Sequence, residues 1–161
     1  MSGPRSLHVS EWPDSDRCAW QEACRPGSRL RSGGAASYLA PVSRHDFANR
    51  YGAFLAFLQR RGRLDLSAAA TAQVTSANVD AYITELEYRV RSVTVYNCVY
   101  KLRRAAELIA PAADFSWLAE IEKDLALVMQ PRSKLDRLVF TERLVEAGLF
   151  RELLEREFPK S

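Results

Sequence analysis

The sequence predicts an all-α fold, and three observations lead to that prediction. Apolar residues recur at the i, i+3, i+4, i+7 spacing of amphipathic helices in four successive stretches between residues 43 and 128. Serine, threonine or aspartate precedes these stretches and glycine or proline ends several of them, as is typical of helix termini. No stretch has the regular alternation of a half-buried strand. The chain has 161 residues, of which 47% are hydrophobic, so it can bury the core of one domain.

We expect residues 1–40 to form a flexible basic segment, because glycine, proline, serine and arginine recur there and Gly33-Gly34 is typical of a hinge. A short helix is expected within DSDRCAWQEAC, residues 14–24, with Trp12 packing against its start. The stretch RPGSRLRSGG that follows fits either a solvated linker, which we favour slightly, or a basic arm along a DNA backbone.

Residues 41–130 are expected to form the main helical domain. Its first helix is predicted to begin at Ser43, with Asp46 completing a capping box, and to end before Gly62. Gly52 in its middle costs about 1 kcal/mol relative to alanine, so we expect another helix to approach closely there. Three arginines at the end of this helix serve the helix dipole, a phosphate or both: Arg60, Arg61 and Arg63.

The second helix is predicted to begin at Thr75 or Ser76, and Arg89 and Arg91 lie in and after its last turn. A fourth helix is expected to have Asp114 as its N-cap. Its outer face is expected to be acidic, which would repel DNA and mark the back of the domain, through Glu120, Glu122 and Asp124.

The third predicted helix, residues 92–110, has the clearest division between a core face and a polar face. Ser92 is its expected N-cap, and Pro111 ends it. One apolar arc holds Val95, Cys98, Val99, Leu102, Ala105, Ala106 and Ile109. The opposite side holds a row of Thr94, Asn97, Lys101 and Arg104, with Tyr96, Tyr100 and Arg103 beside it. A polar face is usually only solvated, but hydroxyl, amide and cationic groups in a row also suit a nucleic-acid backbone.

Residues 131–161 are expected to hold an exposed basic linker and a last helix from about Glu142 to Glu157, capped by Thr141. The apolar stripe of that helix needs a partner surface. It can dock back on the bundle, pair with another molecule, or belong to a domain that is missing.

The charge distribution favours an anionic partner on one side of the domain. Eight arginines oppose one aspartate between residues 25 and 63, and five cations with no acid lie between residues 89 and 104. Residues 107–124 instead hold five acids and one lysine. Because the planar guanidinium group suits phosphate and base recognition, the basic segments are the expected DNA-facing ones.

The sequence holds no motif for catalysis, metal binding or membrane insertion. His8 and His45 have no supporting triad motif, and no phosphate-binding or dinucleotide-binding fingerprint is found. Cys18 and Cys24 lack the spacing of zinc ligands, so no cofactor, metal or small-molecule substrate is expected. No apolar run approaches the roughly 20 residues that cross a bilayer, so we expect no membrane partner and a cytoplasmic, DNA-associated location.

Four stretches in order resemble the N-terminal core-binding domain of tyrosine recombinases, the phage-integrase family, over roughly residues 41–130. They are YGAFLAFLQRRGRLD from Tyr51, VTSANVDAYITEL from Val74, SVTVYNCVYKLRRAAELIAP from Ser92 and DFSWLAEIEKDL from Asp114. The resemblance implies a four-helix SAM-like bundle that grips one side of duplex DNA while a separate C-terminal catalytic domain grips the other.

The catalytic domain of that family, with its tyrosine nucleophile and His-x-x-Arg motif, has no counterpart in the sequence. Residues 131–148 resemble only its linker and opening helix. The expectation is therefore a truncated, non-enzymatic DNA-binding half, to which no catalytic residue can be transferred. The resemblance also leaves room for contacts with other recombinase subunits on the DNA.

The predicted function is sequence-tolerant binding of duplex DNA in integration and recombination. The expected DNA-binding residues are Arg60, Arg61, Arg63, Arg89, Arg91, Thr94, Asn97, Lys101 and Arg104. The arginines would neutralise phosphates, and Asn97 is the candidate for reading a base edge. Two alternatives stay open: a helical protein-interaction module that uses the last helix and the tyrosine-rich face of residues 92–110, and a non-functional integrase remnant.

Overall fold

The computed structural model describes residues 5–129, and this part of the chain is mostly helical. A 3₁₀ turn, η1, spans Val9–Glu11, and four α-helices follow: α1 Asp14–Ala23, α2 Pro41–Arg60, α3 Ser76–Arg89 and α4 Ser92–Ile109. Residues 116–129 are also helical. Residues 5–129 contain no strand, which confirms the all-α prediction at this level. The predicted linker and last helix, residues 131–161, lie outside the described residues.

The chain divides into two compact units, residues 1–122 and 123–161. The first unit contains α1 to α4 and, in its described part, the N-terminal segment from residue 5 onward. Of the second unit, only residues 123–129 are described, and they are helical.

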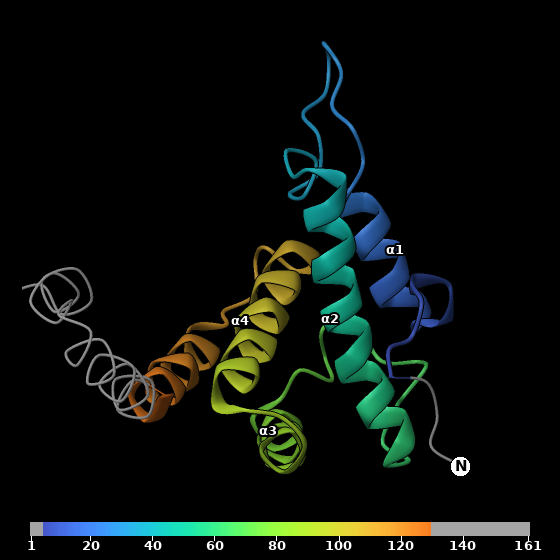
Figure 1. Ribbon diagram of the computed structural model, residues 1–161. Helices are drawn as coiled ribbons and strands as arrows, with labels where there is room; N and C mark the ends of the chain where they lie inside the picture. The colour runs from blue at the N-terminus through green and yellow to red at the C-terminus, as the bar shows by residue number, and fades with distance from the viewer. Residues whose placement is uncertain (1–4, 130–161) are drawn as a thin grey trace, which may run out of the picture. The chain divides into compact units, whose positions relative to one another are not determined.

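Helix α4 packs against α1, α2 and α3, and Figure 1 shows it beside α2. All seven residues of its predicted apolar arc are buried, including Cys98, as the helical spacing predicted. Helix α2 is buried around most of its circumference near its C-terminal half, through Tyr51, Gly52, Phe54, Leu55, Ala56, Phe57 and Leu58. A helix buried on several sides has neighbours on several sides, and α2 contacts both α3 and α4.

The N-terminal segment packs against α2 in its described part, which differs from the flexible segment that its composition predicted. Leu7 and Trp12 are each only 2% exposed, and the indole nitrogen of Trp12 donates to the Leu7 carbonyl at 3.0 Å. The Leu7 amide in turn donates to the Gly52 carbonyl at 3.0 Å. Aromatic burial therefore outweighs the glycine and proline content between the aromatic positions.

Gly52 permits this docking, because a Cβ at that position would lie 2.2 Å from the Leu7 carbonyl oxygen. The close approach that the mid-helix glycine predicted is confirmed. The predicted partner was wrong: the approaching segment is the backbone around Ser6 and Leu7, and not another helix. A non-helical segment can come nearer to a helix backbone than a second helix can, because it brings fewer side chains to the contact.

A buried carboxylate joins α1 to α2 and to the loop between α2 and α3. Asp16 is 1% exposed and accepts hydrogen bonds from the Tyr51 hydroxyl at 2.5 Å and the Thr71 amide at 3.0 Å. Thr71 has a φ of 60°, in the left-handed region that few threonines adopt. Burial raises the pKa of Asp16, while the bonds from Thr71 and Tyr51 oppose that shift.

Two helix ends lie where the sequence predicted them, and two helix starts do not. Gly62 has a φ of 67°, and the bonds from Gly62 to Gln59 and from Arg63 to Leu58 complete a Schellman motif at the end of α2. The Thr75 hydroxyl caps α3 by accepting from the Asn78 amide at 3.2 Å. Both ends were predicted.

The predicted N-caps Ser43 and Ser92 were wrong. Helix α2 begins two residues earlier, at Pro41, because proline suits a first helical position whose N–H has no partner in any case. The N-cap of α4 is Arg91, which makes no side-chain capping bond. Before residues 116–129, Asp114 accepts from the Ser116 amide at 2.9 Å, as an aspartate at a helix start was expected to do.

Candidate nucleic-acid interface

The polar row of α4 is open only in its N-terminal half. Asn97 is exposed and Thr94 is partly exposed, and neither side chain has a hydrogen-bond partner among residues 5–129. Both lie within the first two turns of α4, which begins at Ser92 directly after the exposed Arg91. The amide of Asn97 and the hydroxyl of Thr94 are therefore available to an external ligand.

Lys101 occupies the third position of the row, and it pairs with another helix. Its Nζ lies 2.6 Å from an oxygen of Asp46 on α2, and the two side chains are 28% and 40% exposed. The predicted capping role of Asp46 is not found, because α2 begins at Pro41 and leaves Asp46 within its second turn. The pair instead ties α4 to α2.

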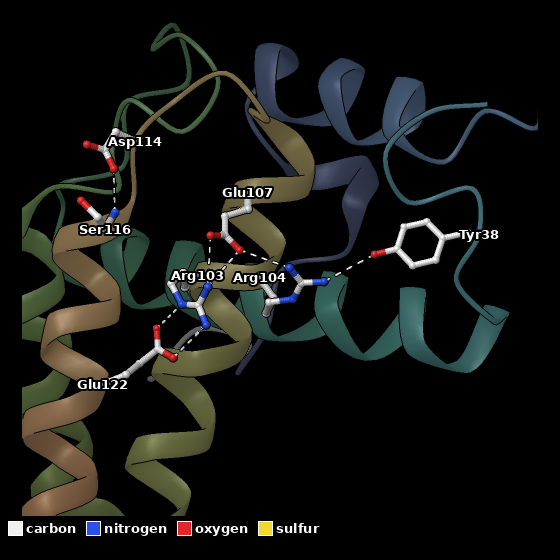
Figure 2. Close-up of polar contacts among 7 residues, drawn as sticks. All are labelled: Tyr38, Arg103, Arg104, Glu107, Asp114, Ser116 and Glu122. Carbon is white, nitrogen blue, oxygen red and sulfur yellow. Dashed lines mark hydrogen bonds and ion pairs between the residues drawn. The ribbon is translucent and has the colours of Figure 1, made fainter. Parts of the chain in front are cut away.

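Arg104, the fourth member of the row, is held by two neighbours (Figure 2). One guanidinium nitrogen lies 3.3 Å from Glu107, one turn further along α4, and another donates to the Tyr38 hydroxyl at 3.5 Å. Partial burial would lower the pKa of Arg104, but the bonds to Tyr38 and Glu107 outweigh it, so that the pKa is raised. This arginine is thus already engaged within the chain.

The prediction of an acidic outer face was wrong for Glu122, which points inward and pairs with Arg103 (Figure 2), whereas Glu120 and Asp124 are exposed. Its side chain is 7% exposed, and it accepts from Nε and Nη2 of Arg103, which also reaches Glu107 at 3.1 Å. The hydrogen bond to Glu122 is the largest cause of the raised pKa of Arg103. Glu122 shares its helix side with the buried Phe115 and Leu118, and a search for apolar residues alone misses this inward position.

Three of the predicted arginines converge on one carboxylate, that of Glu85 on α3. The shortest nitrogen–oxygen distances are 3.0 Å from Arg60, 4.0 Å from Arg61 and 3.6 Å from Arg89. We call these four residues the Glu85 cluster. Arg60 and Arg89 lie in the last turns of α2 and α3, where a cation also favours the helix dipole.

The remaining predicted arginines, Arg63 and Arg91, are exposed and have no ion pair among the described residues. Arg63 follows the Schellman turn that ends α2, and Arg91 lies two residues after Arg89 of the Glu85 cluster. The structure therefore brings Arg60, Arg61 and Arg89 together around Glu85 and leaves Arg63 and Arg91 without an ion pair in the described part of the chain. Lys101 and Arg104 do not belong to this cluster, because each pairs with another residue of the chain.

Sequence reasoning did not anticipate a hollow of about 220 Å³ between the N-terminal segment and α2. Its lining includes both histidines of the chain, His8 and His45, together with Asn49. The described residues hold no group of three histidine, cysteine or acidic side chains that could bind a metal ion. The two histidines lie 37 positions apart in the sequence, so no local motif signals that they share a hollow.

Comparison with protein-family models, with curated proteins and with solved structures found no match to this chain. Among residues 5–129, no helix is both long enough and apolar enough to cross a membrane.

Proposed function

We propose that this chain binds duplex DNA, with little dependence on sequence, as the core-binding part of a tyrosine-type recombinase. The observation that carries the proposal is the arrangement at the α3–α4 turn. Arg89 ends α3, Arg91 precedes α4, and the open residues Thr94 and Asn97 follow in the first two turns of α4. Cations thus directly precede a helix start whose side chains are free to contact a ligand.

Each part of this arrangement suits a different part of DNA. The Glu85 cluster has three guanidinium groups and one carboxylate, and so carries a local excess of positive charge. Guanidinium groups bind phosphate oxygens in a fork, and the first-turn amides of a helix also favour an anion. Phosphate contacts would orient α4, and Asn97 could then pair with an adenine edge.

The recombinase assignment rests on the resemblance of residues 41–130 to a core-binding domain. In that family, strand cleavage belongs to a separate domain, so the part proposed for this chain is DNA binding without catalysis. Tyr96 and Tyr100 have parallel rings with centroids 6.5 Å apart on α4, and we assign neither of them as a nucleophile.

The proposal is tested by the fluorescence anisotropy of a labelled duplex, titrated with the protein at salt concentrations from about 50 to 200 mM. Arg63 and Arg91 give the clearest test, because both are exposed and have no ion pair among the described residues, so their substitution should not disturb the fold. If each contacts one phosphate, the double change to alanine should lower the salt slope by roughly 2. Lys101 and Arg104 stay predicted contacts, but their substitution would also remove the bonds to Asp46, Glu107 and Tyr38.

Arg29→Ala is the control for the loss of one exposed positive charge, and each single change, Arg63→Ala and Arg91→Ala, is compared with it. Arg29 is exposed in the loop between α1 and α2, and that loop lies at the end of the first unit opposite α3 (Figure 1). The control should bind as the unaltered protein does. Absence of binding at about 50 mM salt would disprove the proposal, and equal losses in the control and the double variant would remove Arg63 and Arg91 from the interface.

A further inference from the structure

Glu85 holds the guanidinium groups that DNA phosphates would need. Its carboxylate oxygens accept from Arg60 at 3.0 Å and lie 3.6 Å from Arg89 and 4.0 Å from Arg61. The side chain of Glu85 is 21% exposed, so its carboxylate is partly accessible to solvent. Arg61 and Arg89 are about half exposed, at 55% and 48%, and they belong to two different helix ends.

The convergence of three guanidinium groups on one carboxylate defines a site for an oxyanion. A carboxylate and a phosphate diester each carry one negative charge and accept hydrogen bonds from the same forked donors. Arg61 also lies over the Phe57 ring, with its guanidinium carbon 5.5 Å from the ring centroid, and this contact holds its stem near the cluster. The arginines are therefore positioned for an anion before any external ligand arrives.

We infer that Glu85 is an internal competitor for the DNA backbone. A phosphate diester of the duplex displaces the Glu85 carboxylate from Arg61 and Arg89, the two more exposed arginines. Arg60, whose side chain is only 21% exposed, does not contact the phosphate. This inference rests on the proposed function and specifies how its phosphate site is regulated. Affinity is then set by the difference between the external phosphate and the internal carboxylate, so loss of the carboxylate strengthens binding.

Glu85→Gln tests the inference, with Glu87→Gln as its matched control. Both changes remove one negative charge from α3, but Glu87 is exposed and has no ion pair among the described residues. Glu85→Gln should raise the affinity for a generic duplex at least about fivefold at 100 mM salt. It should also steepen the salt slope by roughly 1, because no released carboxylate then takes up a cation. Glu87→Gln should change affinity less than about twofold and leave the slope unchanged.

Two further measurements test the inference, and Glu85→Asp keeps it testable if Glu85→Gln weakens the fold. Arg61→Gln, alone and combined with Glu85→Gln, should cost more affinity in the Glu85→Gln background than in the unaltered protein, because Arg61 then has no internal carboxylate partner. Glu85→Asp, which keeps the charge but shortens the side chain, should bind with intermediate affinity. Circular dichroism at the assay temperature shows which variants are folded.

The outcomes separate this inference from the proposed function. DNA binding that is equal or weaker in folded Glu85→Gln, or that rises equally in Glu87→Gln, overturns the competitor role and leaves DNA binding in place. The same applies if a folded Glu85→Asp binds as the unaltered protein does and Arg61→Gln costs the same in both backgrounds. Failure of every variant to bind at about 50 mM salt overturns both proposals.

Discussion

Arg103 donates from Nε and Nη2 to the carboxylate of Glu122, a residue that lies 19 positions away in the sequence and has a side chain only 7% exposed (Figure 2). The pair joins α4 to the helical residues 116–122 within the first unit. Because Glu107 shares the same guanidinium group, two carboxylates from two helices meet one cation.

Glu122→Ala should lower the free energy of unfolding by about 3 kcal/mol, because it leaves the partly buried Arg103 without its main partner. Urea unfolding followed by circular dichroism measures this change. The double variant Arg103→Met/Glu122→Leu should lose less stability than Arg103→Met or Glu122→Leu alone, because it removes both charges together. A double loss equal to the sum of the single losses would show that the two residues act independently.

Gly52→Ala should destabilise the protein by about 1 to 3 kcal/mol, because the new methyl group would overlap the Leu7 carbonyl, which a Cβ would meet at 2.2 Å. The sign of this change in the free energy of unfolding is informative. Helix propensity alone favours alanine by about 1 kcal/mol, so stabilisation would show that the N-terminal segment does not dock on α2. Urea midpoints give the sign, and limited proteolysis should show faster cleavage near Leu7 in the variant.

Gly62→Ala separates backbone strain from crowding. No atom lies within 4 Å of a Cβ built at this position, but the φ of 67° disfavours any residue with a side chain. The free energy of unfolding should fall by about 1 kcal/mol in the same urea experiment, without faster cleavage near Leu7. No loss would mean that the end of α2 can change its conformation at little cost.

The buried carboxyl of Asp16 should make stability depend on pH. Burial raises its pKa in the folded protein above the ordinary value of 3.8, so the folded state binds this proton more tightly than the unfolded state. The contribution of Asp16 to stability is therefore largest below its unfolded pKa and is lost as the pH rises through its folded pKa. Relative to Asp16→Asn, the unaltered protein should gain stability as the pH falls from about 7 to about 4.

Urea unfolding of both proteins at several pH values checks this dependence. Asp14→Asn on the same helix is the control, because Asp14 is 84% exposed and pairs with Arg17 at the surface. If the difference between the unaltered protein and Asp16→Asn stays constant over the pH range, the folded and unfolded pKa values of Asp16 are equal and the prediction is wrong.

The three thiols should react with a thiol reagent in a set order. Cys18 is exposed, Cys24 is partly exposed with a pKa raised by burial, and Cys98 is buried with a pKa raised by the same cause. Because the thiolate is the reactive form, Cys18 should react first, Cys24 more slowly and Cys98 only after unfolding. Colorimetric labelling with and without urea measures the order, and Cys18→Ser should lose the fast phase. Rapid labelling of Cys98 in the folded protein would show that the α4 core opens.

Helix positions could be predicted from the sequence, because they depend on spacing within a few turns. The apolar arc of α4, the glycine that ends α2 and the threonine cap of α3 are all local features, and the structure contains them. The candidate site was predicted less completely. Thr94 and Asn97 are open as the helical face implied, but the same face also contained Lys101, which pairs with Asp46.

The sequence by itself thus determined the helices, their apolar sides and the placement of the basic segments, since each depends on neighbouring residues and the period of a helix. Only the tertiary structure decided which charges are available. Glu85 meets arginines from α2 as well as α3, and Glu122 turns inward to Arg103, because the rotation of each helix about its axis is set by packing against its neighbours. Ion pairs between residues 19 to 55 positions apart follow from that packing and leave no local pattern to read, and the same holds for the bond from the Thr71 amide to Asp16.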